Sequence, residues 1–185
     1  MGEGELTRRR PISVVCDNLR SLANVGAIFR LGDAARVERL YLCGITGHPP
    51  YPGDRRPPWV AERAGRVIAR TAIRSVEHVP WEYHESAADV IRNLKTRGTQ
   101  IVALEQTPRS VDYVGAPYRL PLGLVLGHER DGIANPVLEL ADLAVAIPMY
   151  GQGTSLNVAT ALAVCLYEVL RCLPLSDAGR RGHEK

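Results

Sequence analysis

The sequence contains no apolar run long enough to cross a membrane. Its first residues, MGEGELTRRRP, include arginines but lack the apolar stretch that follows the basic part of a secretory signal, so we expect no such signal. Internal repeats and a boundary to a second domain are also absent. A length of 185 residues with 45% hydrophobic residues therefore predicts one compact domain with a full core.

Cysteine is scarce, and neither cysteine nor histidine shows metal-ligand spacing. The four cysteines lie apart in apolar surroundings without a CxxC pair: Cys16, Cys43, Cys165 and Cys172. This distribution argues against a zinc site and against a disulfide framework. The five histidines are equally scattered. We therefore expect reduced, buried cysteines, no metal, and a cytoplasmic protein.

Three common site motifs are missing. No GxxxxGK[ST] pattern is present, which excludes a P-loop. No GxGxxG pattern follows the first predicted strand, so the nucleotide-binding Rossmann fingerprint is absent. No GxSxG pattern is present either, which excludes a hydrolase of the nucleophile-elbow type.

Basic residues only slightly outnumber acidic ones, with 23 Lys and Arg against 20 Asp and Glu. The net charge of +3 is too small to indicate a nucleic-acid partner by itself. Arginines do cluster, at residues 8–10, 55–56 and 180–181. Such clusters can contact phosphates, but on chain ends they are more often solvated. We interpret residues 1–11 as a flexible basic arm and residues 174–185 as a polar tail.

Short apolar, β-branched runs alternate with helical patterns. The predicted strands span residues 12–16, 39–43, 76–79 (weakly), 100–104, 120–126 and 143–147. The predicted helices span residues 22–36, 59–73, 87–97 and 135–141, and a long one follows cap residues Thr154 and Ser155 and ends near Arg171. Residues 44–58, 105–118 and 127–133 are predicted loops. This alternation predicts an α/β fold, a mostly parallel sheet flanked by helices, in a single domain of residues 12–173.

Three polar segments interrupt these elements. The first lies in the first predicted helix and contains Asn24, Gly26 and Arg30. Because glycine costs helix stability, Gly26 indicates a close approach of another group. The simplest structural interpretation of Arg30 is an ion pair with Asp33 one turn later.

The second polar segment, residues 127–133, directly follows a predicted strand. In open parallel sheets, ligands bind beyond the carboxyl ends of strands. Gly127 and Gly132 permit tight turns there, and Glu129 is placed to accept hydrogen bonds that order the loop or to meet an arginine. The alternative is a solvated turn.

The third segment joins the last predicted strand to the last helix. Pro148 ends the strand, Gly151 and a second glycine follow, and then come the polar Ser155 and Asn157. A glycine-containing loop before a helix N-terminus is a common ligand site, because the first helical N–H groups lack partners within the helix. Ser155 is explained as a cap, whereas Asn157 has no evident structural role. The helix beyond is apolar on every side, which predicts burial in the core or in a subunit interface.

Together these segments resemble the SpoU-type (TrmH-like) RNA ribose 2′-O-methyltransferases of the SPOUT superfamily. The matching patterns are Asn24-x-Gly26-x-x-x-Arg30, LGxExxGI at residues 126–133 and IPMxGxxxSLNVAxAxAVxLYE at residues 147–168. The resemblance extends over residues 12–173. It implies an α/β fold with a deep C-terminal trefoil knot, a homodimer with the last helix in its interface, S-adenosylmethionine as cofactor, and tRNA or rRNA as substrate.

The resemblance also implies roles for individual residues. The residues it places at the reacting groups are Arg30, Asn24, Glu129, Ser155 and Asn157. Those it places at the cofactor are Leu104, Glu105, Leu126, Gly127, His128, Ile147, Pro148, Met149, Gly151, Ser155 and Leu156. Arginine does not normally deprotonate, so we expect Arg30 to orient the ribose hydroxyl and its neighbouring phosphate rather than to act as a base.

Two departures from larger relatives leave the substrate open. We expect no separate RNA-binding domain before Ile12 and only a short C-terminal extension. We therefore expect RNA affinity from the catalytic surface, a dimer groove and the basic arms. A non-catalytic RNA-binding or assembly factor on the same scaffold is one alternative, and methylation of a base rather than a ribose is another.

Overall fold

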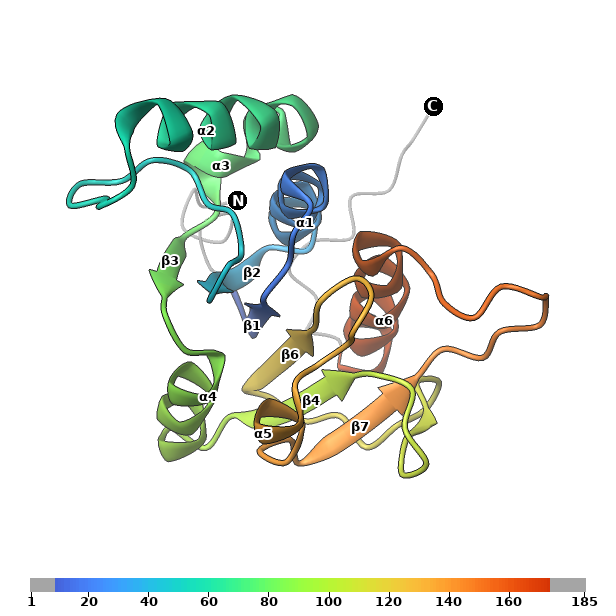
Figure 1. Cartoon of the computed structure of the whole chain (residues 1–185). Coiled ribbons are helices and arrows are strands. Elements are labelled where there is room, and N and C mark those ends of the chain that lie inside the picture. Colours follow the sequence, from blue (N-terminus) through green and yellow to red (C-terminus); the bar gives the residue numbers. More distant parts are fainter. Residues whose placement is uncertain (1–8, 174–185) are drawn as a thin grey trace, which may run out of the picture.

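A computed structural model describes residues 9–173 of the chain, and one seven-stranded sheet forms its centre (Figure 1). The strands are β1 (Arg10–Asp17), β2 (Val37–Cys43), β3 (Trp81–His84), β4 (Gln100–Leu104), β5 (Val111–Asp112), β6 (Leu122–Leu126) and β7 (Leu143–Ala146). Their order is β3-β2-β1-β6-β4-β7-β5, and every pairing between them is parallel. The predicted α/β fold with a mostly parallel sheet is confirmed.

Six helices accompany the sheet in the described part of the chain. They are α1 (Leu22–Ala34), α2 (Pro58–Ala72), α3 (Ser75–His78), α4 (Ala87–Thr96), α5 (Asn135–Leu138) and α6 (Val158–Cys172). The strands alternate their side chains between two apolar layers: Val14 and Cys16 pack with α1 and α6, whereas Val15 packs with α4 and α5. Within the described residues, no helix has the length and apolarity that a membrane span requires.

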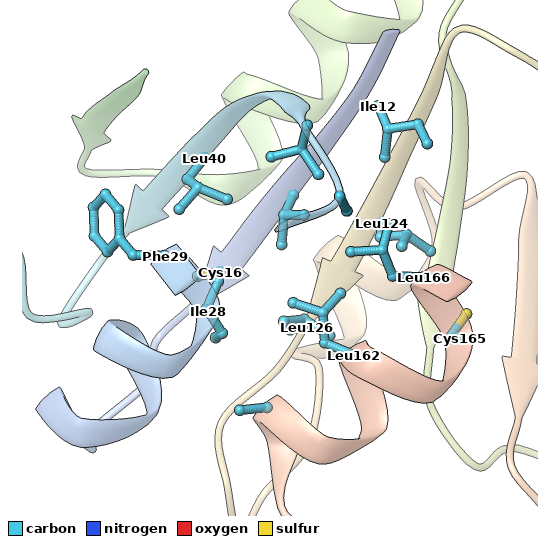
Figure 2. Close-up of a cluster of buried hydrophobic side chains, with 14 of the residues drawn as sticks. Ile12, Cys16, Ile28, Phe29, Leu40, Leu124, Leu126, Leu162, Cys165 and Leu166 are labelled. Atoms are coloured by element: carbon cyan, nitrogen blue, oxygen red, sulfur yellow. The ribbon is translucent and has the colours of Figure 1, made fainter. Parts of the chain in front are cut away.

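The larger apolar layer joins the two halves of the chain (Figure 2). Ile28 and Phe29 of α1 and Leu162 and Leu166 of α6 are fully buried against the sheet. Leu126, at the end of β6, lies among them in the close-up. This packing fixes α1 and the start of α6 side by side, which brings together the two helices that carry the first and third polar segments.

Gly26 makes the close approach that its place in a helix predicted. A Cβ atom at this position would lie 2.0 Å from Thr71 Oγ1 and 2.3 Å from the carbonyl oxygen of Ile68. The neighbour is therefore helix α2 rather than a ligand. Gly26 serves the packing of α1 against α2.

Three predicted boundaries were wrong. Residues 76–79 do not form a strand, since residues 75–78 form α3 and the strand β3 begins at Trp81, where the carbonyl group of Pro80 accepts a hydrogen bond from the N–H of Leu40. The predicted loop 105–118 contains the two-residue strand β5. Strand β1 begins inside the predicted basic arm, because the N–H of Arg10 already donates to the carbonyl oxygen of Arg36. The rest of the arm, residues 1–8, and the tail, residues 174–185, lie outside the described residues.

All four cysteines are free, and burial differs among them. Cys16, Cys43 and Cys165 are buried, and Cys172 is half-buried. Burial raises the pKa of the Cys43 thiol to about 12, which keeps it protonated at neutral pH. The prediction of burial is confirmed for three of the four cysteines.

Candidate functional site

A cavity of about 380 Å³ lies at the carboxyl ends of three neighbouring strands, β6, β4 and β7. Its walls come from the segments that follow these strands and from the start of α6. The lining residues are Leu104, Glu105, Gln106, Leu126, Gly127, His128, Glu129, Arg130, Gly132, Val145, Ala146, Ile147, Met149, Thr154, Ser155, Leu156, Val158 and Ala161. The position agrees with the rule that ligands of open parallel sheets bind beyond the strand ends.

The loop after β6 is folded tightly back on itself. The N–H of His128 donates to the carbonyl oxygen of Gly132 at 3.0 Å, and the N–H of Gly132 donates to that of His128 at 2.9 Å. A Cβ atom at Gly127 would lie 2.2 Å from the carbonyl carbon of Gly132, so a side chain at that position would collide with the backbone. Residues 127–133 thus form a closed turn rather than a loosely solvated one.

Glu105 holds this turn from the neighbouring strand β4. Its Oε2 atom accepts a hydrogen bond from the N–H of Ile133 at 2.8 Å, and its Oε1 atom accepts one from the N–H of Gln106 at 3.0 Å. Gly132 passes so close, with φ +70°, that a Cβ atom there would lie 2.4 Å from Glu105 Oε2. Both carboxylate oxygens therefore serve the backbone of two loops that line the cavity.

Glu129 joins the second polar segment to the first. Its Oε2 atom accepts a hydrogen bond from the N–H of Arg20, and its Oε1 atom accepts one from the N–H of Ser21, both at 2.9 Å. Oε1 also accepts a hydrogen bond from Asn24 Nδ2 at 3.0 Å. Partial burial acts to raise the pKa of Glu129, but these hydrogen bonds outweigh it and the pKa lies below its ordinary value. The side chain is an anion that fixes the start of α1.

Asn24 in turn joins the first segment to the third. Asn157 Nδ2 donates to Asn24 Oδ1 at 2.9 Å. Asn157 Oδ1 accepts hydrogen bonds from the N–H groups of Ala159 and Thr160, so Asn157 is the N-cap of α6. The prediction that Thr154 or Ser155 caps this helix was wrong, and Asn157 does have a structural role. The helix begins two to three residues later than predicted, which leaves Thr154 and Ser155 in the cavity wall.

Arg30 lies outside this network in the single chain. Its side chain is exposed on α1, six residues after Asn24, and it does not line the cavity. Within residues 9–173 it forms no ion pair with Asp33, whose carboxylate instead accepts a hydrogen bond from Ser75 Oγ at 3.3 Å. The expected Arg30–Asp33 pair is therefore wrong, and Arg30 remains available to a molecule that approaches α1.

The cavity contains most of the residues that the resemblance places at the cofactor. Pro148 and Gly151 are the two that do not line it, and of the residues placed at the reacting groups only Glu129 and Ser155 do. Sequence reasoning missed lining residues next to predicted ones: Gln106, Arg130, Gly132, Val145, Ala146, Thr154, Val158 and Ala161. Val145 and Ala146 had a usable signal, because they lie near the carboxyl end of the predicted strand 143–147, where a ligand is expected to bind.

Comparison with known proteins agrees with this arrangement. Residues 11–167 match the SpoU rRNA Methylase family. The chain is 34% identical over 167 residues to the tRNA (guanosine(18)-2′-O)-methyltransferase of Escherichia coli (strain K12), a match that covers 90% of this chain and 66% of that protein.

Two solved structures are similar in fold. The A. aeolicus TrmH/SpoU tRNA modifying enzyme superimposes with a TM-score of 0.74 at 30% identity, over 89% of this chain and 76% of that one. The AdoMet-bound rRNA methyltransferase from Sinorhizobium meliloti superimposes with a TM-score of 0.74 at 28% identity, over 90% and 58%. With the motif segments joined at one cavity and the match extending over most of its length, the chain belongs to the SpoU rRNA Methylase family.

Proposed function

We propose that this protein transfers the methyl group of S-adenosylmethionine to a ribose 2′-hydroxyl of tRNA or rRNA. One observation carries the proposal: the hydrogen-bonded chain from Glu129 through Asn24 to Asn157 unites the three motif segments at the rim of the cavity. The names of its relatives support the reaction. One is a tRNA 2′-O-methyltransferase and another is an AdoMet-bound rRNA methyltransferase.

The cavity residues fit S-adenosylmethionine. A volume of about 380 Å³ lies within the range of small-molecule sites. Apolar side chains from three strand ends and from α6, among them Leu104, Leu126 and Ile147, provide walls for a flat adenine ring. The backbone of residues 127–132 and the side chains of Ser155 and Arg130 provide polar groups for the ribose and the amino-acid end. When bound, the cofactor supplies a methyl group on a sulfonium, which is a good leaving group.

The chain's own residues then have to align the RNA and dispose of one proton. Glu129 is an unsuitable base, because its lowered pKa makes it a weak proton acceptor and both of its oxygens already accept hydrogen bonds from the start of α1. We assign it, with Asn24 and Asn157, the role of holding α1 at a fixed distance from the cavity. Arg30 orients the 2′-hydroxyl and the adjacent phosphate, and that phosphate or a water molecule accepts the proton.

The place of Arg30 favours a site shared between two copies of the chain. Arg30 is exposed on α1, and α1 packs beside α6, whose outer side keeps Tyr167 52% exposed and Val164 half-buried. A homodimer formed on this apolar surface covers these side chains and brings Arg30 of one copy to the cavity of the other. This arrangement explains why Arg30 contacts no cavity residue of its own chain.

Four further family features complete the proposal. The C-terminal trefoil knot is supported by the path of the chain, which leaves β7, passes the strand ends and packs α6 against β4 and β6. One methyltransferase domain begins at Arg10, where β1 starts, and extends to residue 173. Residues 174–185 form a polar tail. The four free thiols support a reducing compartment, the cytoplasm.

Incubation of the protein with tritium-labelled S-adenosylmethionine and bulk tRNA or rRNA tests the proposal. We expect label in RNA, and nuclease digestion with mass spectrometry should locate it on a ribose. Label on a base would show a base methyltransferase instead. Measurable cofactor binding without incorporation into any RNA would refute the proposed transfer and favour a non-catalytic RNA-binding factor.

A further inference from the structure

A second, larger cavity of about 1230 Å³ lies beyond the ends of β2 and β3. One wall is the connection from β2 to α2, residues 44–57, which Figure 1 shows as an extended loop beside α2. The other walls are the first turns of α2, with Val60 and Arg63, and the start of α4, with Ser86 and Asp89. We call this cavity the arginine groove, because Arg20, Arg55, Arg56 and Arg63 line it.

Positive charge predominates in the arginine groove. Arg20, Arg55 and Arg63 are exposed, and among the described residues none of them has a carboxylate within ion-pair distance. Two of the three lining carboxylates are already paired. Asp54 binds Arg56 at 2.6 Å, and the hydrogen bonds from Arg56 lower the pKa of Asp54 to about 2. Asp89 binds Arg92, also at 2.6 Å. Within residues 9–173, Glu85 is the single lining carboxylate without an ion pair, against three arginines without one.

The loop that forms the wall is held in place by its own contacts. Arg56 Nη2 donates to the carbonyl oxygens of His48 and Pro49 at 3.0 and 3.3 Å. The ring of His48 is buried and lies 4.3 Å from that of Tyr83. Tyr51 packs beside His48 and keeps 37% of its surface exposed in the groove. The groove thus combines a fixed shape, three free guanidinium groups and an accessible aromatic ring.

The arginine groove neighbours the candidate active site through one hydrogen bond. The N–H of Arg20 donates to Glu129 Oε2, and Glu129 lines the first cavity, while Arg20 also lines the groove. One hydrogen bond therefore links a residue of the groove to a residue of the first cavity. An RNA strand whose reacting ribose lies beside Glu129 therefore has the arginine groove as a neighbouring surface.

We propose that the arginine groove binds the single-stranded RNA next to the nucleotide that is methylated. The proposal rests on the proposed RNA methyl transfer and adds the part of the chain that holds the substrate. Arg20, Arg55 and Arg63 contact successive phosphates, since guanidinium groups suit phosphate oxygens. The exposed face of Tyr51 stacks on a base, which an unpaired strand permits and a duplex does not.

Two double variants of the full-length protein test the groove. Arg55→Ala with Arg63→Ala removes two groove arginines. Arg70→Ala with Arg74→Ala is the matched control, because both of these residues are exposed, belong to α2 or follow it, and lie outside the groove. For each variant, the affinity for a single-stranded RNA is measured at several salt concentrations. The affinity for S-adenosylmethionine and the KM for substrate RNA are measured alongside.

We expect the groove variant to bind RNA roughly tenfold more weakly and to reduce the slope of log affinity against log salt by about 1.4, the value for two lost phosphate contacts on a single strand. Its KM for RNA rises by a similar factor, while kcat and cofactor affinity stay unchanged. The control keeps the wild-type slope. Equal slopes and affinities in the two double variants would overturn the proposal, as would loss of kcat alone.

The same measurements test the RNA-binding role of the groove separately from the proposed methyl transfer. Groove-dependent RNA binding by a wild-type protein that labels no RNA supports the groove and refutes the proposed methyl transfer. If the wild type methylates RNA and the groove variant binds RNA as tightly as the wild type, the proposed methyl transfer is supported and the RNA-binding role of the groove is refuted. If the wild-type protein binds no RNA, the proposal that the groove binds RNA is refuted.

Discussion

Asn157 and Asn24 stand 133 positions apart in the chain and are joined by a 2.9 Å hydrogen bond from Asn157 Nδ2 to Asn24 Oδ1. The neighbours of each amide fix its orientation. Asn24 Nδ2 donates to the Glu129 carboxylate, so its oxygen faces Asn157. Asn157 Oδ1 accepts from the first N–H groups of α6, so its nitrogen faces Asn24. Neither amide can turn over without losing partners at both ends.

Asn157 can be tested by substitutions that separate its two contacts. Asn157→Ala removes both the cap and the bond to Asn24, and the cap alone stabilises by about 1 kcal/mol. Asn157→Asp keeps an acceptor for the helix N–H groups but has no donor for Asn24 Oδ1. We expect the Asp variant to melt near the wild-type temperature and to lose roughly tenfold in methyl transfer, the effect of about one hydrogen bond. Equal loss of melting temperature in both variants would mean that the bond to Asn24 is structural.

Arg30→Ala tests the proposed catalytic role. Arg30 is exposed and does not line the cofactor cavity, so we expect the variant to bind S-adenosylmethionine normally and to unfold at the wild-type temperature, while transfer to RNA is abolished. Calorimetry and tritium incorporation measure the two functions. A parallel loss of cofactor binding would indicate that Arg30 supports the structure of the site rather than the reaction.

Gly132→Ala should destabilise the turn beside the cavity by more than the cost of its positive φ angle alone. A residue with a Cβ atom at φ +70° costs about 1–2 kcal/mol, and here the added carbon also meets Glu105 Oε2. Gly98 has a similar φ of +76° with open space around it, so Gly98→Ala carries only the cost of the angle. We expect both variants to lose stability and Gly132→Ala alone to lose cofactor affinity, as measured by calorimetry. Normal cofactor binding by Gly132→Ala would contradict the assignment of this turn to the cofactor site.

Gly26→Ala should destabilise the protein even though alanine is the better helix former. In an exposed helix this change gains about 1 kcal/mol. At Gly26 the added carbon collides with the backbone of α2 at Ile68, so we expect a net loss of about 1–3 kcal/mol in urea unfolding. Gly65 of α2 is a suitable comparison, since there the added carbon meets only the ring of Pro50 in a loop, and the loss should be smaller. A stabilised Gly26→Ala variant would disprove the close packing of α1 on α2.

The lowered pKa of Glu129 predicts how stability depends on pH. Because its folded pKa lies below its unfolded value of about 4.3, the hydrogen bonds of the carboxylate stabilise the fold above that value, and this contribution is lost as pH falls through the folded pKa. Glu129→Gln has no such titration. We expect the difference in unfolding midpoint between the two proteins to shrink between about pH 5 and pH 3. A difference that stays constant across this range would show that the charge of Glu129 is not used.

The sequence by itself was sufficient for five of the seven strands, β1, β2, β4, β6 and β7, and for the place of the cavity. Alternating apolar runs such as those at Val14 and Leu124 determine which residues form strands, since each strand must bury side chains on both faces of a parallel sheet. The polar loops that follow two of these strands could be placed at one edge by the same reasoning. Short elements were harder: residues 75–78 form a helix, because the pairing with β2 is taken by residues 81–84.

Only the tertiary structure decided what the polar residues of these loops contact. The sequence marks Asn157 as unusual, but its cap of α6 depends on where the chain bends after Met149, and its bond to Asn24 depends on the packing of α6 beside α1. In the same way, Gly26 was recognised as a site of close approach, whereas its neighbour, α2, lies 42–45 residues further along the chain. Local sequence determines local conformation, because backbone preferences and hydrophobic periodicity act over a few residues. Contacts between distant segments are fixed by how whole helices and strands pack, and that packing is what unites Glu129, Asn24 and Asn157.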